Sequence, residues 1–154
     1  MQLIGSRTLP FPRERVWAAL LDPEVLRTAL PGCEELVPNG EGTFNAKVTI
    51  GVGAIKGSYK GKVRLFDLEE PQQLRIAVEG GGGPGRMRGE GLVELEEVEG
   101  GTKLVYDGEA ATFGPIARVG QRLLRSAANK LLGEFFGRLE DEIGRVDDTA
   151  APTA

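Results

Sequence analysis

The chain contains no histidine and a single cysteine, and these two gaps exclude several classes of active site. Histidine is the commonest acid or base near neutral pH, so its absence removes the serine and cysteine triads that depend on it. It also removes every zinc site with an imidazole ligand, and Cys33 alone cannot form an intrachain disulfide or a thiolate zinc site. We therefore expect no bound metal, no cofactor and no catalytic constellation, and hence no enzyme.

A surplus of positive charge and a long apolar run are missing as well. The 154 residues carry a net charge of −4, whereas nucleic-acid binders carry a basic surplus that neutralises phosphates. No apolar run approaches the roughly 20 residues that span a bilayer, and the N-terminal stretch does not have the pattern of a signal peptide. We expect a cytoplasmic protein without a nucleic-acid partner.

Apolar periodicity predicts one domain with a clear order of elements. A strand at 1–9 precedes two short helices at 13–21 and 23–30, with Asp22 as the N-cap of the second. Between residues 33 and 112 apolar and polar residues alternate, as in the segment 43–52, which is typical of antiparallel strands with one buried face. A long amphipathic helix is predicted at 115–144.

These elements predict an α+β fold of the helix-grip type. A curved antiparallel sheet of about seven strands would wrap around the C-terminal helix, with two short helices after the first strand. The domain would cover residues 1–144, and the polar segment 145–154 is expected to be a disordered tail. A sheet wrapped around one helix tends to leave a space between them, where we expect a hydrophobic ligand.

The inward positions of this fold form the candidate wall of a ligand cavity, since core and pocket wall share one surface in such a fold. The large apolar residues at these positions are Phe44, Val48, Ile50, Val63, Leu65, Ile76, Val78, Met87, Val93, Leu104 and, on the helix, Leu124. Tyr59 and Tyr106 add hydroxyl groups that either orient a ligand oxygen or bond a backbone group. Gly120 and Gln121 are further candidates near the start of the helix.

Four inward glycines and one glycine-rich segment have two interpretations each. Gly61, Gly89, Gly91 and Gly108 either leave room for a ligand or allow the sheet to curve or the helix to approach closely. The segment Gly80–Gly85 is followed by a strand pattern instead of a helix, which excludes a phosphate-binding loop. It favours a long mobile hairpin tip, which is either a gate at the cavity mouth or a connection with no role.

Three arginines on the predicted last helix form a candidate partner or membrane face. Arg118, Arg122 and Arg125 follow helical spacing on the side opposite the apolar stripe. Such a row is either a solvated helix face or a docking face for an acidic partner or anionic lipid headgroups.

Motifs spread over residues 1–144 resemble the G-subunit family of carbon monoxide dehydrogenase, part of the START-like (SRPBCC) superfamily. They are VWAAL at 16–20, DPEVL at 22–26, PGCE at 31–34, GSYKGKV at 57–63, GTKLVY at 101–106 and FF at 135–136.

This resemblance implies a non-enzymatic accessory protein of a molybdenum hydroxylase, which recruits that enzyme to the membrane or carries a quinone or lipid-like molecule. Some members end in a hydrophobic extension that has no counterpart in DDTAAPTA, which favours transient contact at the inner face of the membrane or a soluble carrier. Two alternatives stay open: a START-like polyketide cyclase or hydrolase, and an interaction protein with a filled core.

Overall fold

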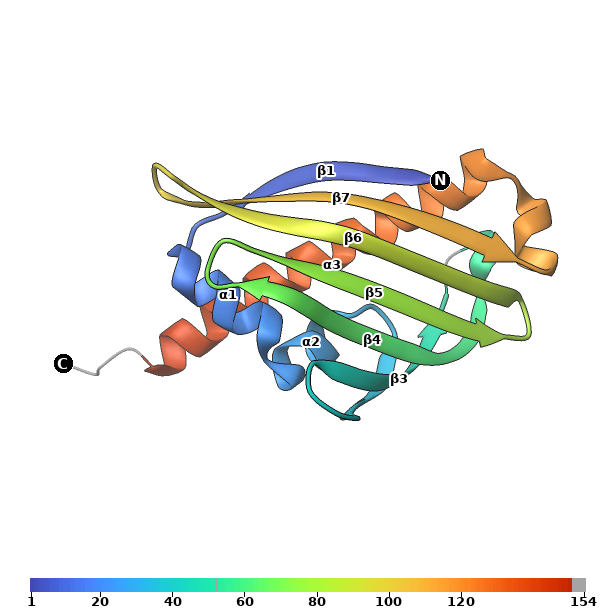
Figure 1. The fold of residues 1–154 in the computed structure, drawn as a ribbon, viewed down its shortest axis with the longest axis horizontal. Coiled ribbons are helices and arrows are strands. Elements are labelled where there is room, and N and C mark those ends of the chain that lie inside the picture. The colour runs from blue at the N-terminus through green and yellow to red at the C-terminus, as the bar shows by residue number, and fades with distance from the viewer. Residues whose placement is uncertain (52, 151–154) are drawn as a thin grey trace.

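Seven antiparallel strands form one curved sheet, and a long helix crosses its inner face in the computed structural model (Figure 1). The structure describes residues 1–51 and 53–150. The strands are β1 (Gln2–Leu9), β2 (Cys33–Pro38), β3 (Thr43–Ile50), β4 (Gly57–Glu69), β5 (Gln73–Gly82), β6 (Gly85–Val98) and β7 (Gly101–Phe113). Their order in the sheet is β1-β7-β6-β5-β4-β3-β2, so β1 and β2 are its edges. The predicted α+β fold is confirmed.

The helical elements include two short 3-10 turns besides the expected helices. They are α1 (Arg13–Leu21), α2 (Pro23–Ala29), η1 (Gly53–Ile55), η2 (Pro115–Val119) and α3 (Gln121–Ala150). Helices α1 and α2 lie beside the C-terminal half of α3, and η2 lies by the turn between β5 and β6 (Figure 1). The predicted segment 43–52 ends as a strand at Ile50, and residue 52 lies outside the described residues.

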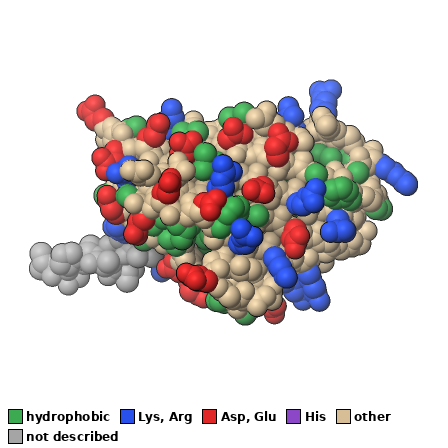
Figure 2. All heavy atoms as spheres, in the orientation of Figure 1, with side chains coloured by type: hydrophobic (Ala, Val, Ile, Leu, Met, Phe, Trp, Pro, Cys, Tyr) green, Lys and Arg blue, Asp and Glu red, His purple; other side chains and the backbone are tan. Residues whose placement is uncertain are grey.

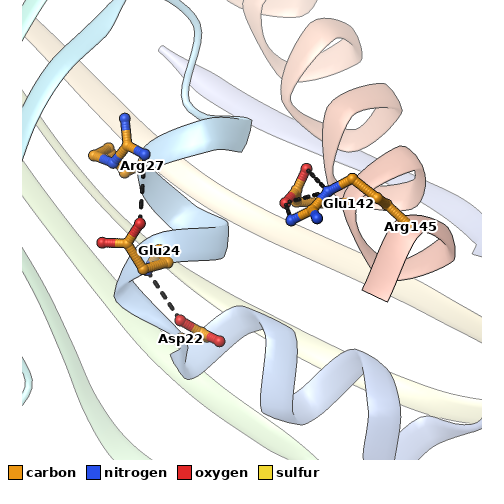
Figure 3. A network of polar contacts seen from close by, with 5 residues as sticks. All are labelled: Asp22, Glu24, Arg27, Glu142 and Arg145. Atoms are coloured by element: carbon orange, nitrogen blue, oxygen red, sulfur yellow. Dashed lines mark hydrogen bonds and ion pairs between the residues drawn. The ribbon is translucent and has the colours of Figure 1, made fainter. Parts of the chain in front are cut away.

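Polar contacts fix the start of α2 and border its contact with α3 (Figure 3). The Asp22 side chain accepts a hydrogen bond from the backbone N–H of Glu24 at 2.9 Å, which satisfies one free donor of the first turn. Glu24 also pairs with Arg27 at 3.4 Å. On α3, the hydrogen bond from Arg145 lowers the pKa of the Glu142 carboxyl, and the charge of Arg27 adds to this effect. The predicted N-cap of the second helix is therefore confirmed.

The glycine-rich segment 80–85 is mostly strand, so the prediction of a long mobile hairpin tip is wrong. Gly82 on β5 pairs with Gly85 on β6 across a tight turn. A backbone ladder forms without side chains, and the Pro84 carbonyl of the turn accepts a hydrogen bond from the Ile116 N–H at 2.8 Å. The turn is therefore tied to η2.

The predicted helix 115–144 is divided at Gly120. This residue has φ 97° and ψ 149°, a conformation that a helix cannot contain and that only glycine adopts readily. Arg118 therefore lies on η2, and the predicted single face with Arg122 and Arg125 does not exist as one helix face. Helix α3 continues to Ala150, so residues 145–150 are helical where a disordered tail was predicted, and residues 151–154 lie outside the described part.

Buried apolar residues form two clusters along α3. The larger one joins α1, α2 and the C-terminal half of α3 to one end of the sheet, with Leu9, Trp17 and Leu139 among its members. The smaller one lies at the other end of the sheet and contains Ile50, Ile55, Tyr59, Ile116, Leu124 and Ala127. The sheet surface between the two clusters is where a ligand space can exist.

Candidate functional site

The centre of the inner sheet face lies between the two clusters and carries few side chains. In the register of β5, β6 and β7, Val78 faces Gly89 and Gly89 faces Ala110, while Gly91 faces Gly108. We call this surface the inner-face gap, defined by Val78, Gly80, Gly89, Gly91, Gly108 and Ala110. Glycine has no side chain and alanine has only a methyl group, so these residues leave the space above the sheet unfilled.

The exposure of inward residues shows that the inner-face gap is not filled by side chains. Val78 faces inward, in register with Val63, yet it is 40% exposed. Val63, Ile76 and Met87 are half-buried on the same face. Helix α3 packs mainly on α2, and also on η1, α1 and β1. Solvent therefore reaches the apolar centre of the sheet beneath the helix.

The inward glycines have different roles: one allows two strands to approach closely, and another leaves space on the inner face. A Cβ at Gly61 would overlap the Glu79 carbonyl oxygen, so the close approach of β4 and β5 requires glycine there. At Gly89 an added Cβ would lie 3.3 Å from Val78 Cγ2, and no atom of α3 lies within 4 Å of it. The packing of α3 therefore does not require glycine at position 89. The missing side chain leaves the space beside Val78 open.

The predicted cavity residues divide into three groups. Those accessible on the inner face are Val48, Val63, Ile76, Val78, Met87, Val93 and Tyr106. Those buried in the two clusters are Phe44, Ile50, Tyr59, Leu65, Leu104 and Leu124. The third group is Gly120 and Gln121, which are exposed at the start of α3 and belong to neither buried cluster.

The two inward tyrosines have different surroundings. The Tyr59 hydroxyl donates a hydrogen bond to the Ile55 carbonyl at 2.5 Å inside the smaller cluster, and burial raises the pKa of Tyr59. Tyr106 stacks on Phe136 of α3 with ring centroids 5.3 Å apart. A Cβ at Gly5 would overlap the Tyr106 hydroxyl, so this group lies over β1, on the side away from Val78. The Tyr59 hydroxyl thus bonds a backbone group, the second of the two roles predicted for it.

Cations and exposed apolar residues gather at the end of the molecule that holds η2. Arg118, Arg122 and Arg125 are all exposed there, as predicted, although they do not share one helix. Phe113 is 44% and Leu123 56% exposed, and the Arg88 guanidinium lies 5.6 Å from the Phe113 ring centroid. We call Arg88, Phe113, Arg118, Arg122, Leu123 and Arg125 the basic end. Figure 2 shows Lys and Arg gathered toward this end and Asp and Glu toward the opposite one.

The described residues offer no metal cluster and no membrane span. Within 1–51 and 53–150, no three histidine, cysteine, aspartate or glutamate side chains are placed to hold a metal ion. No helix in the same part of the chain is long and apolar enough to cross a bilayer.

Comparison with known proteins identifies the family. The sequence model for the G subunit of carbon monoxide dehydrogenase (CoxG) matches residues 5–144. The chain belongs to the CoxG family. No curated protein matches it.

Solved structures share the fold of this CoxG family protein. A conserved protein from Geobacillus kaustophilus is 34% identical, with 94% of this chain and 96% of that chain covered and a TM-score of 0.91. A Rhodobacter sphaeroides protein is 25% identical, with 94% and 92% covered and a TM-score of 0.69. An uncharacterised Rhizobium leguminosarum protein is 22% identical, with 94% and 95% covered and a TM-score of 0.71, which shows the fold alone.

The CoxG motifs that carried the resemblance shape the backbone. In the motif 31–34, Gly32 has φ 72°, and a Cβ there would overlap the Thr49 carbonyl oxygen, so only glycine lets the chain pass from α2 to β2 against β3. In the motif 57–63, Gly61 allows the close approach of β4 to β5. These two motifs thus build the curved sheet.

Sequence reasoning missed several residues of the inner-face gap and of the basic end. Gly80 continues the alternation of its strand, so the register itself could have placed it inward. Phe113 ends β7 at an outward position, in register with Arg86, so the same alternation could have placed it on the outer face. Leu123 carries no such signal, because an apolar residue in an amphipathic helix reads as core.

Proposed function

We propose that this CoxG family protein binds a hydrophobic small molecule, of the quinone or lipid class, in the inner-face gap. The observation that carries the proposal is the 40% exposure of Val78 on the inward face of a central strand. An exposed apolar surface beneath a covering helix loses hydration when an apolar ligand covers it, which favours binding.

The protein would act as a non-enzymatic accessory of a molybdenum hydroxylase of the carbon monoxide dehydrogenase type. Family membership supports the partner, and the chemistry of the gap supports the absence of catalysis. The accessible side chains at and around the gap are Val63, Ile76, Val78, Met87 and Val93, which neither donate nor accept protons. Tyr106 lies next to Val93, but its hydroxyl lies over Gly5 of β1, away from Val78. A polyketide cyclase or hydrolase would need an acid or base there.

The basic end would make transient contact with an anionic membrane and so aid recruitment or quinone delivery. Arginines attract anionic headgroups while exposed apolar side chains enter the interface. Phe113 and Leu123 among four arginines form such a surface. This end also borders the smaller apolar cluster, through Ile116 of η2, so a ligand leaving the gap at this end would meet the membrane directly.

The test is to fill the inner-face gap and measure ligand binding. Val78→Trp places a large side chain in the gap and is expected to weaken binding of a short-chain menaquinone analogue at least tenfold in calorimetry. Its matched control is Ala77→Trp, on the same strand but on the outer face. Equal binding by both variants and the wild-type protein would exclude the gap as the binding site.

A further inference from the structure

The outer face of the sheet, opposite α3, carries a hollow of about 610 Å³ over β2 to β6. We call it the outer hollow, and its wall includes Val37, Lys47, Lys60, Lys62, Glu79 and Arg86. The hollow forms where β4 and β5 approach closely at Gly61 and Gly80, two glycines that face each other in the register. It lies on the opposite side of the sheet from the inner-face gap.

Cations are placed next to one another along one row of the outer hollow. Lys47 on β3 lies directly opposite Lys60 on β4, and Lys60 lies opposite Gly81, which pairs with Arg86. The Arg86 Cγ is 3.2 Å from where a Gly81 Cβ would be, so the arginine stem lies across this glycine. Within the described part of the chain, Lys60, Lys62 and Arg86 have no carboxylate at ion-pair distance.

This arrangement of cations favours binding of an anionic partner. Like charges directly opposite each other in a sheet destabilise it, and an external carboxylate against Lys47 and Lys60 would remove that repulsion. Lys47 has one partner, Glu34 at 3.7 Å on the edge strand, while Lys60 has none in the described residues. The row therefore keeps a net positive charge that the fold itself does not neutralise.

The shape and the remaining wall residues favour a protein segment over other anions. A flat bilayer surface does not reach the floor of a hollow, and the carboxylates of Glu35 and Glu79 repel a densely charged phosphate polymer. Val37 is 52% exposed at the rim and offers an apolar contact. Carboxylates spaced along a peptide can meet the lysines and avoid Glu79.

We propose that the outer hollow docks an extended acidic segment of a partner protein. The carboxylates of the segment lie against Lys47, Lys60 and Arg86, and an apolar side chain of the segment covers Val37. This docking surface does not depend on the hydrophobic ligand, because the sheet separates it from the inner-face gap. The two proposals therefore stand or fall separately.

The experiment measures fluorescence anisotropy of a labelled peptide in which glutamate alternates with leucine. The full chain is expected to bind it, with affinity that falls as salt is added, and the double variant Lys60→Gln, Arg86→Gln to lose at least tenfold. The charge-conserving variant Lys60→Arg, Arg86→Lys is expected to keep binding within about threefold, which separates loss of charge from loss of folding. The matched control Arg122→Gln, Arg125→Gln removes equal charge from α3 and is expected to leave the affinity within about twofold.

Three results would overturn the proposal. The first is equal binding of a peptide with glutamine in place of glutamate. The second is equal loss of affinity in the α3 control, which would show an effect of net charge alone. The third is binding of single-stranded DNA or phosphatidylglycerol vesicles that is tighter than binding of the peptide and is abolished by the double variant Lys60→Gln, Arg86→Gln. This result would assign the surface to another class of partner.

Discussion

Tyr59 and Tyr106 occupy equivalent inward positions, yet only Tyr59 has its hydroxyl group engaged by the backbone. Successive side chains of a strand point to opposite faces of the sheet, so both tyrosines were correctly predicted to point inward. The neighbour of each hydroxyl is set by other elements, Ile55 of η1 for Tyr59 and Gly5 of β1 for Tyr106. Alternation within a strand carries no information about either neighbour.

Tyr59→Phe is expected to lower the free energy of unfolding by about 1 kcal/mol, because it leaves the Ile55 carbonyl without its donor. Burial raises the pKa of Tyr59 above its ordinary value of 10.0, so above about pH 10 the unfolded chain loses this proton before the folded chain does. Wild-type stability therefore falls in this range, and that contribution is absent from the variant. Denaturant unfolding at neutral and alkaline pH measures both effects.

Tyr106→Phe is the control for this experiment, since the Tyr106 hydroxyl donates no hydrogen bond to a described residue. It is expected to cost less stability than Tyr59→Phe at neutral pH. An alkaline loss of stability in Tyr59→Phe as large as in the wild-type protein would contradict the role given to Tyr59.

Among the elements, the break between η2 and α3 was the feature that periodicity could not predict. Gly133, Gly137 and Gly144 lie inside α3, whereas Gly120 ends η2, and nothing local distinguishes the four. The difference comes from tertiary contacts: Ile116 is buried, and its N–H bonds the Pro84 carbonyl. These contacts hold η2 against the β5–β6 turn and force the chain to change direction at Gly120.

Substitution of these glycines by alanine should have opposite effects. Gly120→Ala is expected to lower the free energy of unfolding by about 1–3 kcal/mol, because φ 97° with ψ 149° is accessible essentially to glycine alone. Gly133→Ala is expected to raise it by about 0.5–1 kcal/mol, since a Cβ there meets no atom within 4 Å and alanine is the better helix former. Denaturant unfolding of both variants gives the comparison. A loss of stability in Gly133→Ala would contradict this account of α3.

At the scale of the whole molecule, the face drawn in Figure 2 shows Lys and Arg gathered toward one end of the long axis and Asp and Glu toward the other, although the net charge is only −4. The composition predicted the small net charge but not this separation, which arises when the sheet brings distant segments together. Arg88 on β6, Arg118 on η2 and Arg122 on α3 meet at one end in this way. Partner contacts at the two ends are therefore expected to differ in the sign of charge they require.

The basic end is expected to bind vesicles that contain phosphatidylglycerol and not neutral phosphatidylcholine vesicles, with binding that weakens as salt is added. Replacing Arg118, Arg122 and Arg125 with glutamine should weaken vesicle partitioning by on the order of 100-fold, at about 1 kcal/mol for each charge. Flotation with vesicles measures this effect. Replacing Arg64, Arg75 and Lys103 with glutamine removes equal charge from the outer face, and an equal loss there would contradict a role for the basic end.

The division of the apolar core into two clusters also bears on how the molecule opens. A region held by a small cluster can unfold locally at a lower free energy than the rest of a protein. Amides of η1, η2 and the first turns of α3 should therefore exchange hydrogen for deuterium faster than amides around Leu139. A molecule lying in the inner-face gap would touch both clusters and join them, so its binding should slow exchange mainly at the weaker end.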